Sequence, residues 1–388
     1  MLQAVSSDTK PGRKLRIVHC FRSPVGGIFR HVRDLTRAQV AAGHEVGIVC
    51  DSSTGGAFEE QLFAQMQDLL ALGVRRTPMQ RHVGLGDASA AFRTFSVIKE
   101  LRPDVLHGHG AKGGVYSRVF GSLFRVSRSR VARIYSPHGG SLHYDETSLT
   151  GRMLFRLEAA LERLTDQLLF VSEHEYRTYV RKVGRPSCAL CVIYNGLHDA
   201  EFEPVTEAAD ASDFLYVGMM RDLKGIDLFI EALAQVASAT GRMVSATVVG
   251  DGADLARYRR QAASHADISV NFLSAMPARE AFALGRIMVV PSRAEAMPYI
   301  VIEGMAAGKT LVATKVGGIP EILGAESAAL AQPTVASLAE RMGLALRDPN
   351  ALRPAPPVLD AIRQRFSART MAEKVGETYL AALGARVS

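Results

Sequence analysis

The stretch IMVVPSRAEAMPYIVIEGMAAGKTLVAT, residues 287–314, decides the fold class of this chain. Two apolar, β-rich runs flank a segment with a helical apolar pattern that begins at Pro298. Proline suits the first turn of a helix because its missing N–H would be unpaired there in any case. A strand, a helix and a strand in this order indicate a parallel α/β sheet.

Two carboxylates bracket the start of this predicted helix. Glu295 is expected in the loop before the helix, and Glu303 should lie about 7 to 8 Å further along the helix axis, at 1.5 Å per residue. Unpaired backbone N–H groups near Met297, Tyr299 and Ile300, together with the helix dipole, predict an anion site. The result is a phosphate seat with two hydroxyl acceptors, which suits a nucleotide-sugar. The spacing fits equally well a solvated loop residue followed by a surface helix residue.

The alternation of strands and helices extends over most of the chain. KLRIVHC, a Gly-Gly turn, an amphipathic helix and a second strand form a βαβ unit, and DVLHGHG and RIYSPHGG continue the first half. The pattern weakens over residues 192–213, which predicts a linker, and then restarts with FLYVGMM. We therefore expect an α/β fold with two Rossmann-like, doubly wound domains, 1–195 and 196–369, that face a cleft. A helix at 370–388 is expected to pack back on the N-terminal domain.

Length and composition indicate a folded protein. A chain of 388 residues favours two domains, and 47% hydrophobic and 22% charged residues are ordinary for globular proteins. No apolar run is long enough to span a bilayer, and the first residues lack the apolar centre of a signal peptide, so we expect a cytoplasmic protein. The four cysteines, including the CxxC of Cys188 and Cys191, are interpreted as structural thiols because no second pair completes a zinc site.

The net charge is distributed unevenly. Residues 1–195 hold 27 Lys+Arg and 17 Asp+Glu, a balance of +10, whereas residues 196–388 hold 19 and 22, a balance of −3. In the stretch 112–133 apolar side chains alternate with basic ones and no acid intervenes; the basic residues are Lys112, Arg118, Arg125, Arg128, Arg130 and Arg133. This pattern predicts docking on an anionic membrane face. A core helix with a solvated basic face is the alternative.

Several motifs, in their order, resemble glycosyltransferase family 4, whose members are retaining enzymes with the GT-B fold. The Glu-x7-Glu segment PSRAEAMPYIVIEGMAAGKTLVATKVGGIPEIL is similar to the family signature, and the other matching stretches are PVGGIFRHVRDLTRAQVAAGHEV, PDVLHGHGAKGGVYSR, YSPHGG, VIYNGLHDAEFEP, YVGMMRDLKGIDLFIEAL and VVGDG. The likeness begins near Arg16 and is strongest to bacterial enzymes that build exopolysaccharide or other envelope glycans.

The resemblance implies roles in the C-terminal domain. Glu303 should bind the ribose hydroxyls and Glu295 the transferred sugar, while the backbone from Met297 through Pro298 and Tyr299 to Ile300 holds sugar and diphosphate. Lys224, in LKG, matches the diphosphate-binding lysine of the family; without the resemblance it would be interpreted as a solvated lysine. The family arginine that follows the strand glycine is replaced by Met219, and Arg221 is expected to reach the same phosphate.

The resemblance also implies roles for several smaller motifs. His138, in SPHGG, matches a histidine near the sugar, although such a histidine is often only a turn residue. Gly26 and Gly27 match the loop that approaches the phosphate and the acceptor. Gly250 and Gly252, in a partial GxGxxG, are secondary donor-binding candidates. His107 and His109 could suggest a metal pair, but packing and hydrogen bonding are preferred because the motif holds no carboxylate.

The resemblance predicts transfer of a sugar from a nucleoside diphosphate sugar to a glycan or lipid-linked acceptor, with retention at the anomeric carbon. No metal and no cofactor are expected, because Lys224, Arg221 and the helix N-terminus can stabilise the departing diphosphate. No nucleic-acid partner is expected, and the protein is predicted in the cytoplasm, peripheral on the inner face of the plasma membrane. The alternatives are a GT-B-like sugar phosphorylase, a nucleotide-sugar epimerase, or a non-catalytic nucleotide-sugar-binding module.

Overall fold

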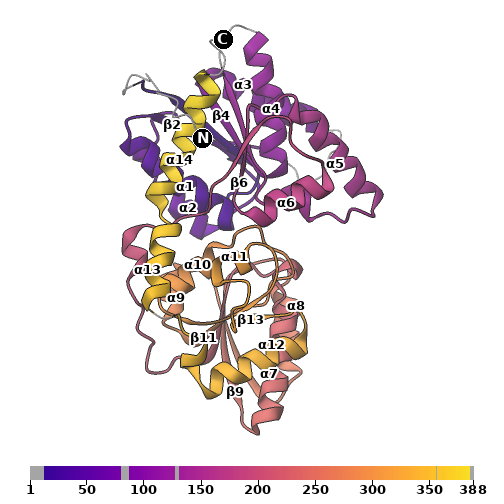
Figure 1. Cartoon of the computed structure of the whole chain (residues 1–388), viewed down its shortest axis with the longest axis vertical. Coiled ribbons are helices and arrows are strands. Elements are labelled where there is room, and N and C mark those ends of the chain that lie inside the picture. The colour runs from indigo at the N-terminus through magenta and orange to yellow at the C-terminus, as the bar shows by residue number, and fades with distance from the viewer. Residues whose placement is uncertain (1–12, 80–86, 127–130, 355, 385–388) are drawn as a thin grey trace, which may run out of the picture.

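The structure is a computed structural model that describes residues 13–79, 87–126, 131–354 and 356–384. Figure 1 shows two lobes stacked along the long axis, each with strands at its centre and helices outside. Both sheets are parallel throughout, so the predicted α/β class with two doubly wound domains is confirmed.

The N-terminal domain is built on a seven-stranded sheet in the order β3-β2-β1-β4-β5-β6-β7. Its strands are β1 Arg16–Phe21, β2 Glu45–Asp51, β3 Gly73–Thr77, β4 Val105–His109, β5 Ala132–Ser136, β6 Gln167–Phe170 and β7 Ala189–Val192. Its helices are α1 Gly26–Ala41, α2 Ala57–Ala64, α3 Asp87–Leu101, α4 Gly110–Val126, α5 Leu149–Glu162 and α6 Glu173–Lys182. Short 3-10 turns are η1 Gln67–Leu69 and η2 Gly140–His143.

The C-terminal domain repeats this topology with six strands in the order β10-β9-β8-β11-β12-β13. Its strands are β8 Ser212–Val217, β9 Val244–Val249, β10 Ile268–Leu273, β11 Gly285–Val290, β12 Thr310–Thr314 and β13 Leu330–Ala331. Its helices are α7 Ile226–Thr240, α8 Leu255–Ala263, α9 Ala278–Phe282, α10 Tyr299–Ala306, α11 Ile319–Leu323, α12 Val335–Arg347 and α13 Pro356–Arg365, and its 3-10 turns are η3 Asp199–Phe202, η4 Asp222–Lys224 and η5 Pro349–Leu352. In both sheets the order reverses at the first strand, where doubly wound folds bind ligands.

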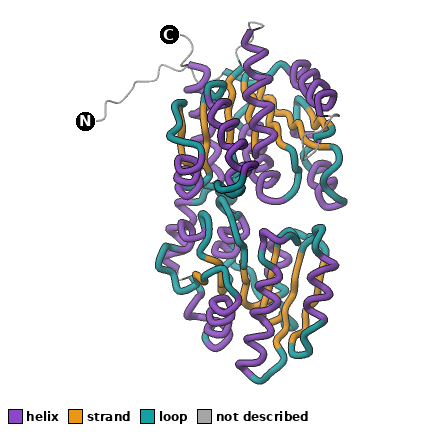
Figure 2. Tube along the Cα trace, turned by 90° about the vertical axis from the view of Figure 1, so that its right-hand side faces the viewer, coloured by secondary structure: helices purple, strands orange, loops and turns teal. Residues whose placement is uncertain are grey.

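The chain crosses between the domains twice. Figure 2 shows the connecting segments between the lobes. The two crossings are hydrogen bonded to each other: Leu197 N donates to Phe366 O, at 2.7 Å, and Ala368 N donates to Leu197 O, at 2.8 Å. After the second crossing, α14 (Ala368–Gly384) lies along the N-terminal domain, where Met371 and Tyr379 join a core cluster with Ile17.

Helix α4 corrects the interpretation of the basic stretch 112–133 as a lipid-docking helix. Arg118 is fully buried and forms an ion pair with Glu158, with 2.8 Å between Nη1 and Oε2. Arg133 is buried and contacts both carboxylate oxygens of Asp166. The apolar side chains Phe120 and Phe124 lie in the core rather than at the surface; Arg128 and Arg130 lie outside the described residues, as do the side chains of Arg125 and Val126. The described part of this stretch is a core helix.

Two further sequence features are located by the structure. Cys20 and Cys50 are buried, and Cys188 and Cys191 are half-buried; all four thiols are free. Within the described ranges, no helix is both long and apolar enough to cross a bilayer.

Candidate active site

The loop between β11 and α10 brings a carboxylate and an ammonium group together. Lys224, at the end of η4, donates from Nζ to Glu295 Oε1 at 2.6 Å, and Ser292 Oγ donates to the same oxygen at 2.6 Å. The lysine and glutamate side chains are only 19% and 10% exposed, so their attraction is weakly screened by solvent. These contacts fix Glu295 at the entrance to α10.

Helix α10 begins one residue later than predicted. Pro298 is the N-cap, with φ −74° and ψ 119°, and Tyr299 is the first helical residue. The N–H groups of Tyr299 and Ile300 have no partner within the helix, as in every first turn. Met297 is buried beneath this turn, and its carbonyl accepts from Asn195 Nδ2 at 2.8 Å. The unpaired donors and the positive dipole end of the helix therefore lie at the boundary with the N-terminal domain.

The loop of Glu295 is pressed against a second loop, after β12. A Cβ on Gly317, whose φ is +59°, would lie 1.8 Å from the carbonyl oxygen of Glu295, and one on Gly318 would lie 2.3 Å from that of Ala296. Only glycine permits this approach. From the N-terminal domain, Ser172 Oγ donates to Ala296 O at 2.9 Å, so both domains hold the loop.

Glu303 is engaged by a residue from the other domain. Arg30, on α1, contacts Glu303 at 2.8 Å, Glu201 at 2.5 Å and Asp34 at 2.7 Å. Burial raises the pKa of Glu303 to about 7; the positive charge of Arg30 opposes this rise, and the negative charges of Glu201 and Asp34 add to it. Arg30 therefore pairs with one acid of its own helix and with two acids of the C-terminal domain, and Glu303 changes protonation near neutral pH.

The Gly-Gly pair that opens α1 contacts the C-terminal domain. Gly26 has φ +65°, and a Cβ on it would lie 3.4 Å from Met219 Cε; a Cβ on Gly27 would lie 3.9 Å from the Tyr299 ring. Met219, at the position of the family arginine, thus packs its thioether toward this pair. The predicted Gly26, Gly27 and Tyr299 are brought together at the domain boundary.

Arg221 is exposed at the start of η4, and its charge acts on His143. Burial lowers the pKa of His143, Glu295 counteracts this shift, and the positive charges of Arg221 and Lys224 reinforce it. His143 lies in η2 on the N-terminal domain, so the two cations face that domain across the boundary. Two positive groups of the C-terminal domain thus lie within electrostatic reach of the N-terminal domain.

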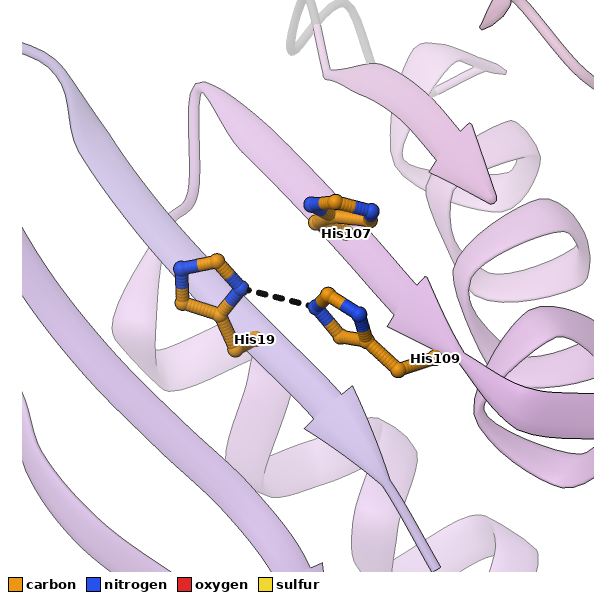
Figure 3. A group of neighbouring side chains, drawn as sticks. All are labelled: His19, His107 and His109. Atoms are coloured by element: carbon orange, nitrogen blue, oxygen red, sulfur yellow. Dashed lines mark hydrogen bonds between the residues drawn. The ribbon is translucent and has the colours of Figure 1, made fainter. Parts of the chain in front are cut away.

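His138 follows β5 in a left-handed conformation, with φ +49°. Its Nε2 lies 3.0 Å from His109 Nδ1, and His109 Nε2 lies 3.0 Å from His19 Nδ1, a contact drawn in Figure 3. His19 Nε2 contacts Gln39 Oε1 at 2.9 Å, and Gln39 Nε2 donates to Tyr379 OH at 3.4 Å. An amide oxygen only accepts, so His19 must carry its proton on Nε2. By the same logic His109 and His138 are protonated on Nε2, and His138 Nδ1 is left as an acceptor.

The histidines of this network are neutral. Burial lowers the pKa of His19 to about 4, and burial reinforced by neighbouring histidines holds the pKa of His109 and His138 well below the ordinary value. His107 adds contacts to Tyr379 OH at 2.7 Å and to Ser136 Oγ at 2.9 Å. Nitrogens of His19, His107 and His109 lie within 4.8 Å of one another, a spacing that a metal ion could use. The same histidines are also joined by hydrogen bonds to one another and to Ser136 and Tyr379.

Gly250 and Gly252 have a packing role. A Cβ on Gly250 would lie 2.0 Å from Gly218 O, and one on Gly252 would lie 2.2 Å from Met220 O. The loops that follow β8 and β9 therefore touch backbone to backbone, and this contact supports the segment that carries Arg221.

Sequence reasoning missed several residues of the site: Arg30, His31, His143, Asn195 and Ser292. Arg30 follows the Gly-Gly turn by one helical turn, a spacing that would have placed it on the same side of α1 as that turn. His31 Nδ1 contacts Asn195 Oδ1 at 3.0 Å, and Asn195 Nδ2 donates to Met297 O, so Asn195 joins α1 to the loop before α10. No local sequence pattern predicts this contact, because Asn195 lies in the linker, outside any helix or strand.

Sequence comparisons cover both domains. The family profile "Glycosyltransferase Family 4" matches residues 25–201, and "Glycosyl transferases group 1" matches residues 211–348. Glycogen synthase of Mycobacterium tuberculosis is 26% identical over 382 residues, which cover 92% of each chain. A phosphatidylinositol N-acetylglucosaminyltransferase subunit of Arabidopsis thaliana is 24% identical over 335 residues, which cover 83% of this chain and 71% of that one.

Solved structures establish the fold. The crystal structure of Anabaena HepE in complex with UDP-glucose matches with a TM-score of 0.76 at 20% identity, over 94% of this chain and 99% of that one. Sucrose-phosphate synthase of Thermosynechococcus elongatus matches with a TM-score of 0.74 at 19% identity, over 96% of this chain and 100% of that one. With the family profiles on both domains and this fold, the chain belongs to glycosyltransferase family 4 and is a glycosyltransferase.

Proposed function

We propose that this glycosyltransferase moves a sugar, with retention, from a nucleoside diphosphate sugar to a glycan or lipid-linked acceptor in the synthesis of exopolysaccharide or another envelope polysaccharide. The observation that carries the proposal is the contact of 2.6 Å between Lys224 Nζ and Glu295 Oε1 at the N-terminus of α10. It joins a cation for the diphosphate to a carboxylate for the sugar, next to unpaired backbone N–H groups.

In the proposed reaction, the bond between the anomeric carbon and the diphosphate oxygen breaks while the oxygen of an acceptor hydroxyl bonds to the same carbon, and the proton of that hydroxyl passes to the departing diphosphate. Negative charge grows on the departing diphosphate, and Lys224, Arg221 and the first turn of α10 stabilise it without a metal. Glu303 accepts hydrogen bonds from the ribose, and His138 Nδ1 accepts one from a hydroxyl of the transferred sugar. Arg30 holds Glu303 in place until the donor binds.

The test begins with a panel of nucleoside diphosphate sugars. A true donor at 100 times its Kd should raise the free energy of unfolding by about 2.7 kcal/mol, seen as a higher melting temperature. Release of nucleoside diphosphate should then require an acceptor, and NMR of the product should show the anomeric configuration of the donor. Dependence on orthophosphate would indicate a phosphorylase, turnover without release an epimerase, and binding without turnover a non-catalytic module.

His138→Ala is expected to abolish most transfer while leaving the affinity for the nucleoside diphosphate unchanged. The reason is that the side chain faces the sugar rather than the diphosphate, and removal of one oriented contact costs roughly 10² in turnover. Calorimetry with the nucleoside diphosphate measures the affinity, and a coupled release assay measures transfer. His138→Gln, which retains an acceptor, should recover part of the turnover. Loss of diphosphate binding in His138→Ala would assign His138 a different role.

Donor affinity is expected to fall as the pH is lowered from 8 to 6. The pKa of Glu303 is raised to about 7, so the acceptor form of its carboxylate predominates above this pH and is lost below it. The Kd should rise by roughly tenfold, the change expected one unit below a controlling pKa. Calorimetry at each pH gives the Kd. In Glu303→Gln the Kd should be raised at every pH and its pH dependence should be flat; a slope unchanged from the natural protein would contradict this assignment.

A further inference from the structure

Helix α5 carries an apolar stripe on its outer face. Leu149, Met153 and Leu157, spaced four residues apart, are 83%, 64% and 46% exposed. This spacing puts the three side chains on one side of the helix. Figure 1 shows α5 at the outer right edge of the N-terminal domain, with no other element beyond it. Large apolar side chains in a row at a surface mark an interaction site.

Positive charge borders this stripe. Arg152, Arg156 and Arg163 are exposed on α5 or directly after it, and none of them forms an ion pair with any residue that the structure describes. We call these three arginines, with Leu149, Met153 and Leu157, the α5 outer face. Apolar side chains flanked by arginines are typical of a helix that lies in the interface of an anionic membrane.

The acids of α5 are turned inward. Glu158 is buried and accepts from Tyr135 OH, at 3.1 Å, and from Ser141 Oγ, at 2.8 Å. Glu162 is buried and accepts from Tyr179 OH at 3.1 Å. These bonds fix the helix on its domain and leave the α5 outer face with positive charge alone.

The loop before α5 holds exposed Asp145 and Glu146. Glu146 lies 3.7 Å from Arg181, which offsets its charge.

The α5 outer face lies close to the active site along the chain. The turn η2 connects His138, after β5, to the loop that leads into α5, and its last residue, His143, interacts electrostatically with Glu295 and Lys224. Lys182 fastens this connection by donating to Leu142 O and Tyr144 O at 2.8 and 2.7 Å. A short, hydrogen-bonded segment therefore links the start of α5 to the candidate active site.

We propose that the α5 outer face docks the enzyme on a lipid surface with anionic headgroups, where a lipid-linked acceptor is presented to the active site. This inference rests on the proposed function for the identity of the acceptor. A second copy of the chain is disfavoured as the occupant, because a twofold contact would place the arginines of one α5 against those of the other. The basic stretch 112–133 contributes Arg118 and Arg133 to the core instead, so α5 replaces it as the docking element.

The test is co-sedimentation of the full chain with vesicles of phosphatidylcholine alone or mixed with phosphatidylglycerol. Binding is expected only to the mixed vesicles, and it should weaken strongly between 0.05 and 0.5 M salt, concentrations over which the Debye length falls from roughly 14 to 4 Å. Arg152→Ser/Arg156→Ser should lower the partition coefficient by roughly 30-fold, at about fivefold per arginine. Leu149→Ser/Met153→Ser should also reduce binding to the mixed vesicles, and this reduction should be similar at low and at high salt.

The matched control is Arg259→Ser/Arg260→Ser, which removes two exposed arginines from α8 of the C-terminal domain. It should bind mixed vesicles like the natural protein. Equal loss in the two arginine variants, equal binding to both kinds of vesicle, or no binding to either would overturn the proposal, as would a dimer in sedimentation that only the α5 variants lose. Thermal stabilisation by the donor should persist in the α5 variants, so a failure of docking is distinguishable from a failure of the proposed function.

Discussion

Lys224→Ala is expected to lower the turnover number by roughly 10² to 10³, the scale for one preorganised electrostatic contact in an active site. Lys224 is held in position by Glu295 at 2.6 Å and is largely shielded from solvent, so its charge acts on the departing diphosphate with little screening. The measurement is the rate of nucleoside diphosphate release at saturating donor and acceptor. The donor Kd should change much less, because the α10 backbone and Glu303 remain.

Lys99→Ala is the matched control, because Lys99 is exposed on α3 and has no place in the site. It should leave turnover unchanged. Lys224→Arg should retain part of the rate, since the charge is kept while its position shifts. A folded Lys224→Ala enzyme with turnover close to that of the natural protein would remove Lys224 from the step in which the diphosphate leaves.

Arg118→Leu is expected to destabilise the N-terminal domain by about 3 to 5 kcal/mol, because removal of one partner of a buried ion pair leaves the other charge buried and unpaired. The guanidinium lies 4.0 Å above the Tyr135 ring and 2.8 Å from Glu158, and its Nε donates to Gly114 O. The substitution leaves the carboxylate of Glu158 without its cation. Chemical denaturation followed by circular dichroism measures the loss, and the transition of the N-terminal domain should move to lower denaturant concentration.

The double variant Arg118→Leu/Glu158→Leu separates a buried ion pair from simple loss of packing. It should recover much of the stability, because neither charge is then buried without a partner. Arg93→Leu, at an exposed position on α3, is the control and should change stability by less than about 0.5 kcal/mol. A cost below about 1 kcal/mol for Arg118→Leu would mean that Arg118 is not the buried partner of Glu158.

The fold was predictable because buried strands and amphipathic helices each give a characteristic period of apolar residues in the sequence. Buried strands such as IMVVPS and the helices between them have patterns that fix a parallel sheet whatever the distant contacts are. The partners of single charged residues were not predictable in this way. Nothing in the residue type of Arg118 marks it as buried, and only the folding of α5 against α4 supplies Glu158 as its counter-ion.

The site was partly predictable for a related reason. The resemblance implied that Lys224 and Glu295 lie close together, because both belong to motifs that bind the donor in the family. The hydrogen bonds among the histidines could not be predicted, because His19, His109 and His138 come from three neighbouring strands or the loops after them. The tautomer of each histidine also depends on Gln39, at the far end of the network. Arg30 was missed because one of its partners, Glu303, lies on the other domain, and the pairing with Asp34 on its own helix indicates no role in a site.

The return of α14 to the N-terminal domain has a consequence for how the protein is made. Met371, Val375 and Tyr379 fill part of the core beneath β1 and β4, yet the ribosome adds them only after the whole second domain. The first domain to emerge therefore waits with an open hydrophobic face until the second has been synthesised. During this interval the nascent chain exposes a surface of the kind that chaperones bind, and a stop codon placed before Met371 would damage the domain encoded first.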